Sequence, residues 1–175
     1  MSIKANKGEW GEPYVAIRVL GEGKLYIADA DGNKNPHEWM DIVELIRHET
    51  MERIVTYRCK EEDLLIDIDV NGKLVLSVSA SEFLAMADKL ATEIKSAKGS
   101  SFNVSEDITD FLTKIELKHI KAKSIDKSDV FLSVRDPRAS ITRKHIGFSI
   151  KSEFGQNPTL FNTAKASAVV YKVTG

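Results

Sequence analysis

The stretch Lys127–Glu153, KSDVFLSVRDPRASITRKHIGFSIKSE, predicts two strands joined by a polar turn. The even-numbered residues from Val130 to Val134 are apolar, and so are Phe148 and Ile150. Successive side chains of a strand point to opposite faces of a sheet, so this even-numbered set is expected to face the core. The odd-numbered set, which begins with Asp129, is then expected to face a cleft.

The pairing of these two strands selects one acid. With the turn centred near Ile141, antiparallel pairing predicts three opposed pairs: Asp129 with Glu153, Phe131 with Lys151, and Ser133 with Ser149. Asp129 and Lys151 then lie diagonally adjacent on one face, within reach of a common ligand. Asp136 has the opposite parity and lies at the turn, so Asp129 is the acid that we assign to the site.

An acid on one strand, followed on its neighbour by acid-X-Lys, is the pattern of the PD-(D/E)XK nucleases. Hydrolysis of a phosphodiester needs a metal that polarises the phosphate and lowers the pKa of water, and carboxylates are suitable ligands for Mg²⁺. Here Ser149-Ile150-Lys151 occupies the second position, with Ser149 where the acid is expected. On spacing alone the pattern fits either a metal site at Asp129, with Lys151 placed to orient the attacking water and stabilise developing charge, or an ordinary surface hairpin that carries an Asp and a Lys by chance.

Length and composition predict one soluble domain of 175 residues. No apolar run approaches the length of a membrane helix, and the N-terminus lacks the apolar segment of a secretory signal, so a cytoplasmic protein is expected. Cys59 is the single cysteine and the four histidines lack metal-ligand spacing, which argues against a zinc site.

Charge is distributed unevenly along a chain whose net charge is −1. Residues 114–144 contain nine Lys or Arg and four acids, so this segment carries +5 and the remainder −6. A basic stretch on a near-neutral chain indicates either a surface that faces phosphates or an ordinary solvated turn.

The rest of the chain predicts a helix, a β-meander and two further helices. Asn6 and Glu9 have the spacing of a capping box for a helix that runs to Leu20, although Pro13 suggests that the helix proper begins near Gly11. Asn71-Gly72 predicts a tight hairpin turn. The expected strands cover 24–28, 41–47, 53–59, 64–70, 73–78 and, at the end, 168–173. Capping residues Ser79 and Ser105 begin the two later helices.

Together these elements predict an α+β (mixed α/β) fold, and the resemblance described next implies that its core is restriction-endonuclease-like. We expect a central mixed sheet flanked by helices, with an inserted β-meander. In this division the chain is a single nuclease domain with its core in residues 1–23 and 120–175, a meander subdomain in 24–79 and a two-helix segment in 80–119.

Several short motifs resemble the HpaII-like type II restriction endonucleases. They are Lys7–Glu12 (KGEWGE), Lys127–Val130 (KSDV), Gly147–Ser152 (GFSIKS), Gly155, Pro158–Leu160 (PTL) and Asn162, and they span most of the chain. The resemblance implies a PD-(D/E)XK core, dependence on Mg²⁺ and cleavage of short palindromic double-stranded DNA such as CCGG. It also implies a homodimer, because palindromic DNA favours a symmetric pair of subunits.

The chain departs from this pattern at Ser149, so another carboxylate is expected to complete the metal site. The candidates are Glu9 and Glu12 from the first helix and Glu153 from the strand, with the Ile150 carbonyl as a further ligand of Mg²⁺. Polar residues around the site are expected to contact phosphates or base edges. These candidates are Arg143, Lys144, Gln156, Asn157, Thr159, Asn162 and Lys165.

Two other functions remain open from the sequence. A non-catalytic DNA-binding or interaction module would explain Ser149 as a sign of lost chemistry, and a repair nuclease of the same fold would recognise DNA structure instead of sequence. Restriction enzymes of this kind usually continue with further recognition elements beyond a residue such as Gly175, so an N-terminal fragment of a longer enzyme is expected.

Overall fold

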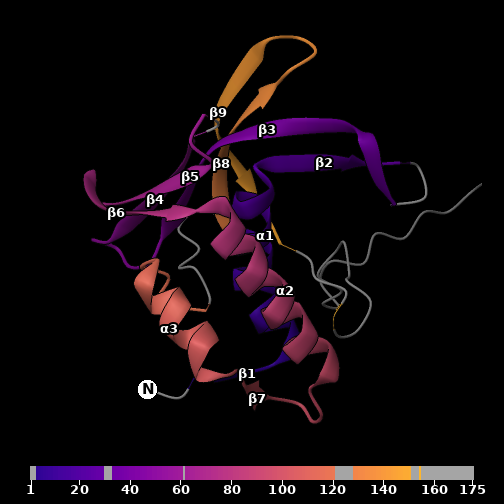
Figure 1. Cartoon of the computed structure of the whole chain (residues 1–175), viewed down its shortest axis with the longest axis vertical. Coiled ribbons are helices and arrows are strands. Elements are labelled where there is room, and N and C mark those ends of the chain that lie inside the picture. The colour runs from indigo at the N-terminus through magenta and orange to yellow at the C-terminus, as the bar shows by residue number, and fades with distance from the viewer. Residues whose placement is uncertain (1–2, 30–32, 61, 121–127, 151–153, 155–175) are drawn as a thin grey trace, which may run out of the picture.

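The computed structural model describes residues 3–29, 33–60, 62–120, 128–150 and 154, and these residues form an α+β fold (Figure 1). Its helices are α1 (Lys7–Glu22), α2 (Ala80–Ser96) and α3 (Glu106–Lys114). Its strands are β1 (Lys4–Ala5), β2 (Lys24–Ala28), β3 (Lys34–His48), β4 (Ile54–Lys60), β5 (Leu65–Val70), β6 (Lys73–Ser79), β7 (Phe102–Asn103), β8 (Val130–Asp136) and β9 (Ile141–Phe148).

One sheet of seven strands dominates the structure. Its order is β6-β5-β4-β3-β8-β9, and β2 pairs with the first half of the long strand β3. Every pairing among the described residues is antiparallel, so the parallel component of the expected mixed sheet is not found among them. Short strands β1 and β7 form a separate two-stranded ladder.

The meander and the β8–β9 hairpin belong to the same sheet because β3 pairs with β4 on one side and with β8 on the other. The expected strands of the meander are present, and β3 begins seven residues earlier than predicted. Asn71 and Gly72 both have positive φ, of 51° and 80°, as the predicted Asn-Gly turn requires. The division into core, meander and two-helix segment stays a prediction.

Helix α1 begins at the predicted cap and not near Gly11. Asn6 accepts a hydrogen bond from the Glu9 backbone N–H while the Glu9 carboxylate accepts one from the Asn6 N–H, both at 2.9 Å. The helix continues through Pro13, which is buried with neighbours such as Trp10 and Ile17. This burial offsets the hydrogen bond that a proline cannot donate. Gly23 ends the helix at φ 62°.

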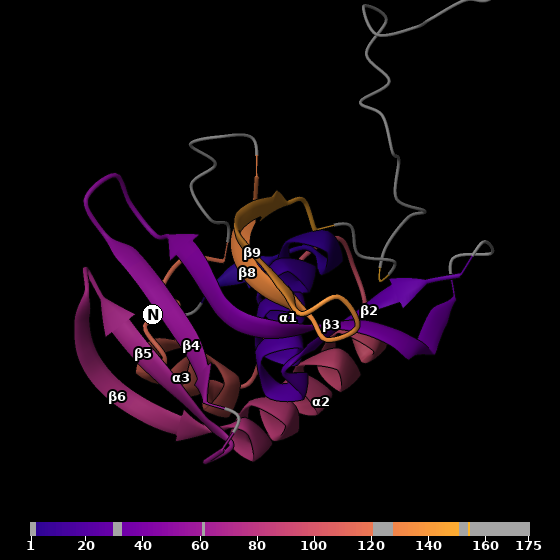
Figure 2. The same cartoon turned by 90° about the horizontal axis from the view of Figure 1, so that it is seen from above.

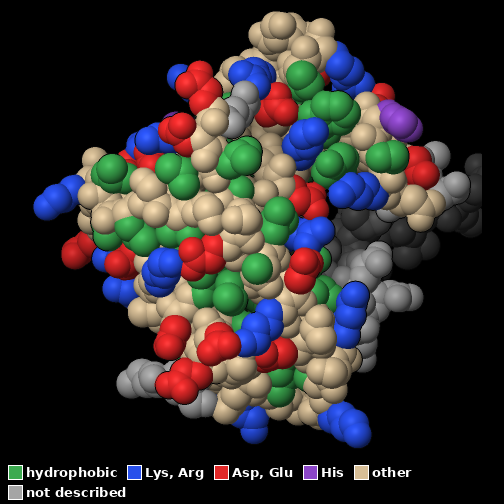
Figure 3. Space-filling view, in the orientation of Figure 1, with side chains coloured by type: hydrophobic (Ala, Val, Ile, Leu, Met, Phe, Trp, Pro, Cys, Tyr) green, Lys and Arg blue, Asp and Glu red, His purple; other side chains and the backbone are tan. Residues whose placement is uncertain are grey.

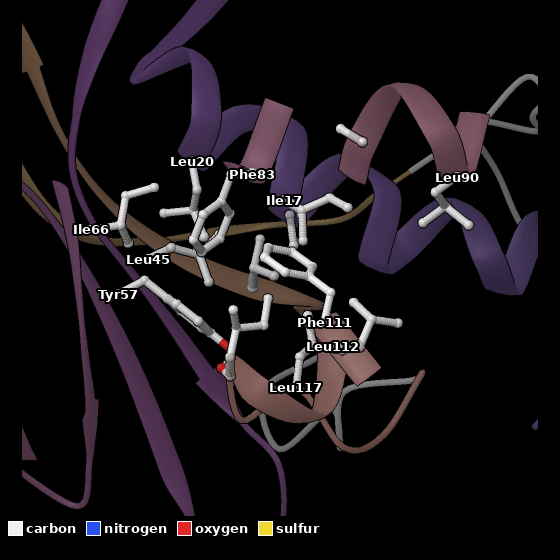
Figure 4. Close-up of a cluster of buried hydrophobic side chains, with 14 of the residues drawn as sticks. Ile17, Leu20, Leu45, Tyr57, Ile66, Phe83, Leu90, Phe111, Leu112 and Leu117 are labelled. Carbon is white, nitrogen blue, oxygen red and sulfur yellow. The ribbon is translucent and has the colours of Figure 1, made fainter. Parts of the chain in front are cut away.

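The three helices cover one face of the sheet, as the two orthogonal views show (Figures 1 and 2). Side chains from all three helices and from the sheet meet in a single core, of which Figure 4 shows a part. Phe83 of α2 and Phe111 of α3 pack edge to face with their ring centroids 5.3 Å apart. The buried Tyr57 hydroxyl donates to the Ile115 carbonyl at 3.0 Å, which ties β4 to the end of α3.

Two further expectations can be placed against this fold. Ser79 caps α2 by accepting from the Glu82 N–H, and Ser105 precedes α3 without a side-chain capping bond. The strand expected at 168–173 lies outside the described residues. Among the described helices, none is both long enough and apolar enough to cross a membrane.

Candidate active site

The β8–β9 hairpin has a different register from the predicted one. Its turn lies at 137–140, so Val130 pairs with Phe148 and Phe131 pairs with Gly147, instead of Phe131 with Lys151. A bulge between Leu132 and Val134 brings the His145 N–H onto Ser133 Oγ at 3.3 Å, so Ser133 does not face Ser149. The prediction failed because a proline-containing turn and a bulge shift the pairing without altering which β8 side chains are apolar.

The corrected register places Asp129 directly against Ser149 and Ile150. The Asp129 N–H donates to the Phe148 carbonyl at 2.9 Å, and Asp129 Oδ2 accepts from the Ile150 N–H at 2.6 Å. Asp129 is half-buried and Ser149 is exposed. The carboxylate thus lies beside the start of the Ser-Ile-Lys motif, whereas the predicted register placed it opposite Glu153.

Gly147 permits this close approach of the two strands. A Cβ at this position would overlap the Ser128 hydroxyl and lie 3.0 Å from Ser128 Cβ. Ser128 immediately precedes Asp129, so any side chain at position 147 would displace the residue next to the carboxylate. Glycine is therefore required here by the space between the strands.

A cavity of about 180 Å³ lies between this hairpin end and helix α1. Its walls are formed by residues of α1, β2, β3, β8, β9 and the two residues after β9: Val15, Ala16, Val19, Leu25, Leu45, Val130, Leu132, Phe148, Ser149 and Ile150. The Tyr14 ring packs edge to face on Phe154, with centroids 5.0 Å apart, so α1 also contacts the segment that follows the motif. The first helix and the hairpin therefore meet at the candidate site.

The geometry of α1 separates its two candidate carboxylates. Glu12 precedes Val15, Ala16 and Val19 by three, four and seven residues, which places it on the helix stripe that lines the cavity. Glu9 lies one turn earlier, where its carboxylate closes the capping box and lines a different pocket beside α3. Glu12 is the better placed of the two for an accessory role.

Most of the remaining candidates lie outside the described residues. These are Lys151, Glu153, Gln156, Asn157, Thr159, Asn162 and Lys165. Their roles stay predictions.

Asp129 and Ile150 provide oxygen atoms of the kind that Mg²⁺ binds. Asp129 Oδ2 accepts from the Ile150 N–H, and within the described chain Asp129 Oδ1 accepts no hydrogen bond. Mg²⁺ commonly uses one or two carboxylates and keeps several waters, so the Asp129 carboxylate fits part of such a shell. Among the described residues, no three His, Cys, Asp or Glu side chains are grouped to hold a metal. A second carboxylate ligand must therefore come from a residue outside the described part of the chain, or from a described side chain that changes its conformation.

Four of the six described cations of the basic segment form ion pairs with acids. Ion pairs join Lys114 to Glu82, Lys118 to Glu116, Arg135 to Asp41, and Arg138 to Glu38 and Asp136. Figure 3 shows acidic and basic side chains interspersed over the visible face. Arg143 and Lys144, both exposed on β9, form no ion pair within the described chain. Of the described cations in this segment, these two are therefore the ones available to a phosphate backbone.

The prediction missed a buried ion pair at the end of β3. Arg47 and Glu49 are joined at 2.7 Å and both side chains are 0% exposed. Their only signal in the sequence is parity, because they follow Leu45 at intervals of two and so share its buried face.

Comparison with known proteins connects this geometry to a family. The family model described as HpaII restriction endonuclease matches residues 6–175. The chain is also 35% identical, over 172 residues, to the type II restriction enzyme HpaII of Haemophilus parainfluenzae. That alignment covers 98% of this chain and 47% of the relative, so the chain spans about half the length of the enzyme that it matches. No solved structure matches the chain.

Proposed function

The chain belongs to the HpaII restriction endonuclease family, and on that premise we propose that it carries the catalytic site of a type II restriction endonuclease. The reaction is the Mg²⁺-dependent hydrolysis of phosphodiester bonds in double-stranded DNA at a short palindromic sequence, with CCGG as the first candidate. The observation that carries this proposal is the contact between Asp129 Oδ2 and the Ile150 N–H, which joins the acid to the Ser-Ile-Lys motif.

In this proposal Asp129 is the central ligand of Mg²⁺ and the Ile150 carbonyl is a second. The bound ion would supply charge to polarise the phosphate and lower the pKa of water. Lys151 orients the attacking water and stabilises the charge that develops on the phosphate. Glu12 replaces the acid that Ser149 lacks, because it lies on the α1 stripe facing the site.

DNA binding is assigned to the edge strand β9, which runs from the turn towards the candidate site. Arg143 and Lys144 are exposed on β9 and have no acidic partner in the described chain, so their charge is available to phosphates. A palindromic substrate calls for two copies of the site, which favours a homodimer. The cytoplasm, where foreign DNA is encountered, is the expected location.

The proposal is tested by incubating a plasmid of known sequence with the protein and Mg²⁺, and mapping the cut ends. Discrete cleavage at one short sequence is expected, with loss of cleavage in Asp129→Ala and Lys151→Ala. Each variant is first shown to be folded by circular dichroism. Full activity in either folded variant contradicts the assignment of that residue.

Two outcomes would support the other functions. Exposed Ser149 in place of an acid favours a non-catalytic DNA-binding module, which would retard DNA in a gel without cutting it under any divalent ion. Cleavage at junctions or flaps, with random sequence at the cut ends, would instead indicate a structure-specific nuclease.

A further inference from the structure

At the end of β3, the buried side chains of Arg47 and Glu49 form a cluster of hydrogen bonds with residues 118–120. Arg47 Nε lies 2.7 Å from Glu49 Oε1, and neither side chain is exposed. Glu49 Oε2 accepts from the Lys118 N–H at 3.1 Å, the His119 N–H at 2.8 Å and His119 Nδ1 at 2.9 Å. Arg47 Nη2 donates to the carbonyls of His119 and Ile120. Five hydrogen bonds thus hold residues 118–120 against β3.

Stability alone gives a weak reason for such a cluster. Burying two charges costs desolvation, and an apolar pair of similar size is often equally stable. Arg47 Nη1 is also buried with no hydrogen-bond partner in the described chain, so part of that desolvation is uncompensated. Charged hydrogen bonds require a particular geometry between donor and acceptor, whereas apolar contacts do not. The cluster therefore defines one position for the backbone of residues 118–120.

The same end of β3 contacts β8, which begins one residue after Asp129. β3 pairs with β8 as far as Ile46 and Phe131. Beyond that pair, His48 lies between Arg47 and Glu49 along the strand and points to the opposite face, where its ring is 5.8 Å from the Phe131 ring. Phe131 is two residues from Asp129. The end of β3 thus contacts residues 118–120 through Arg47 and Glu49 on one face of the sheet. On the other face it contacts β8 through His48.

We propose that Arg47 and Glu49 are positioning residues for the candidate site: by fixing the end of β3, where His48 packs against Phe131 of β8, they keep Asp129 in register with Ile150. This inference rests on the proposed function for its effect on catalysis. Neither residue touches the reacting atoms; both act through Asp129. Loss of the cluster frees residues 118–120, loosens the start of β8 and weakens the bond between Asp129 Oδ2 and the Ile150 N–H.

Hydrogen exchange followed residue by residue by NMR tests the positioning directly. In Glu49→Gln, the amides of Lys118 and His119 lose protection, and those of Asp129 and Ile150 are expected to lose it as well. Asp69→Asn is the matched control, because Asp69 is also buried and ion-paired, with Arg58, but lies on β5, two strands from β3. In that control the amides of Asp129 and Ile150 keep their protection.

Cleavage kinetics give a second measure. Glu49→Gln is expected to lower kcat about tenfold or more, the usual effect of removing a group that orients a metal ligand. The Mg²⁺ concentration for half-maximal cleavage rises, whereas the Kd for DNA in Ca²⁺ is unchanged. Asp69→Asn retains wild-type kcat. If Glu49→Gln does not fold, Arg47→Met combined with Glu49→Leu removes both charges and is tested in the same way.

The inference is overturned if Lys118 and His119 lose protection while Asp129 and Ile150 retain it, since the cluster is then structural only. Exchange needs no cleavage, so it separates this inference from the proposed function. A wild-type protein that never cuts DNA contradicts the proposed function, and the exchange pattern still decides whether the cluster positions Asp129.

Discussion

Asp129 Oδ2 accepts a 2.6 Å hydrogen bond from the Ile150 N–H, so the proposed metal ligand also closes the open end of the β8–β9 hairpin. The Asp129 N–H completes the closure by donating to the Phe148 carbonyl. One residue therefore has two roles that can be separated. Its hydrogen bonds join the strands, and its negative charge is what a cation requires.

Replacing Asp129 in two ways separates these roles. Asn retains an oxygen that can accept from the Ile150 N–H, so Asp129→Asn is expected to change the free energy of unfolding by no more than about 1 kcal/mol. Asp129→Ala leaves that N–H without its charged acceptor and is expected to cost about 1.5–3 kcal/mol. Both variants should lose Mg²⁺-dependent cleavage. Urea denaturation measures the first effect and plasmid digestion the second, and cleavage by a folded Asp129→Asn would exclude the charge from the mechanism.

Gly147→Ala tests the close approach of the strands. The new methyl group meets Ser128 Cβ at 3.0 Å, so the variant is expected to lose about 1–3 kcal/mol of unfolding free energy. Ser128→Gly removes the atoms that it meets. The double variant should therefore be more stable than the sum of the two single changes predicts, and should regain part of the cleavage lost in Gly147→Ala. Additive effects in denaturation would show that Ser128 is not the obstacle.

Glu9 and Glu12 are distinguished by alanine substitution. Glu9→Ala removes half of the capping box and is expected to cost about 1 kcal/mol of stability with cleavage intact. Glu12→Ala is expected to raise the Mg²⁺ concentration that gives half-maximal cleavage. Thermal unfolding and a Mg²⁺ titration of the cleavage rate measure the two properties. Wild-type cleavage in both variants would transfer the accessory role to Glu153.

Features that depend on residues close together in the sequence were predicted more successfully than features that depend on residues far apart. The capping box of Asn6 and Glu9 and the turn at Asn71 were both predicted from residues a few positions apart. Each depends on local backbone geometry, which neighbouring residues dictate. The inward-facing residues of β8 were predicted as well, because alternation does not depend on the partner strand.

The failures involve competition between distant parts of the chain. Pro13 suggested a late start to α1, but burial of its helix face in the core outweighs one missing hydrogen bond. The alternation of apolar and polar residues along one strand gives no information about a bulge in its partner strand. The predicted register of the β8–β9 hairpin was therefore wrong. Arg47 and Glu49 were missed because their partners are backbone groups about seventy residues away.

Tyr57 is expected to make the fold sensitive to alkaline pH. Burial raises the pKa of its phenol above the ordinary value of 10.0 in the folded state, so the folded protein keeps a proton that the unfolded chain releases. The resulting contribution to stability is complete below pH 10 and is lost as pH rises above it, by about 1.4 kcal/mol per pH unit. Tyr57→Phe should remove this component of the slope, at a cost of about 0.5–1.5 kcal/mol near neutral pH from the lost bond to the Ile115 carbonyl. Urea denaturation from pH 8 to 11 measures both, and equal slopes in the two proteins would contradict the assignment.

Arg143 and Lys144 are expected to contribute to DNA affinity through phosphate contacts. Each cation that neutralises a phosphate releases counterions, so the slope of log K against log salt concentration should become less steep by about 0.9 for each one removed. In the double variant Arg143→Ala with Lys144→Ala, the slope should therefore become less steep by about 1.8 per chain, whatever the DNA sequence. Arg138→Ala is the matched control, because Arg138 is already paired with Glu38 and Asp136 and should change the slope little. Binding is measured by fluorescence anisotropy in Ca²⁺ from 50 to 200 mM salt. An unchanged slope in the double variant would remove β9 from the DNA interface.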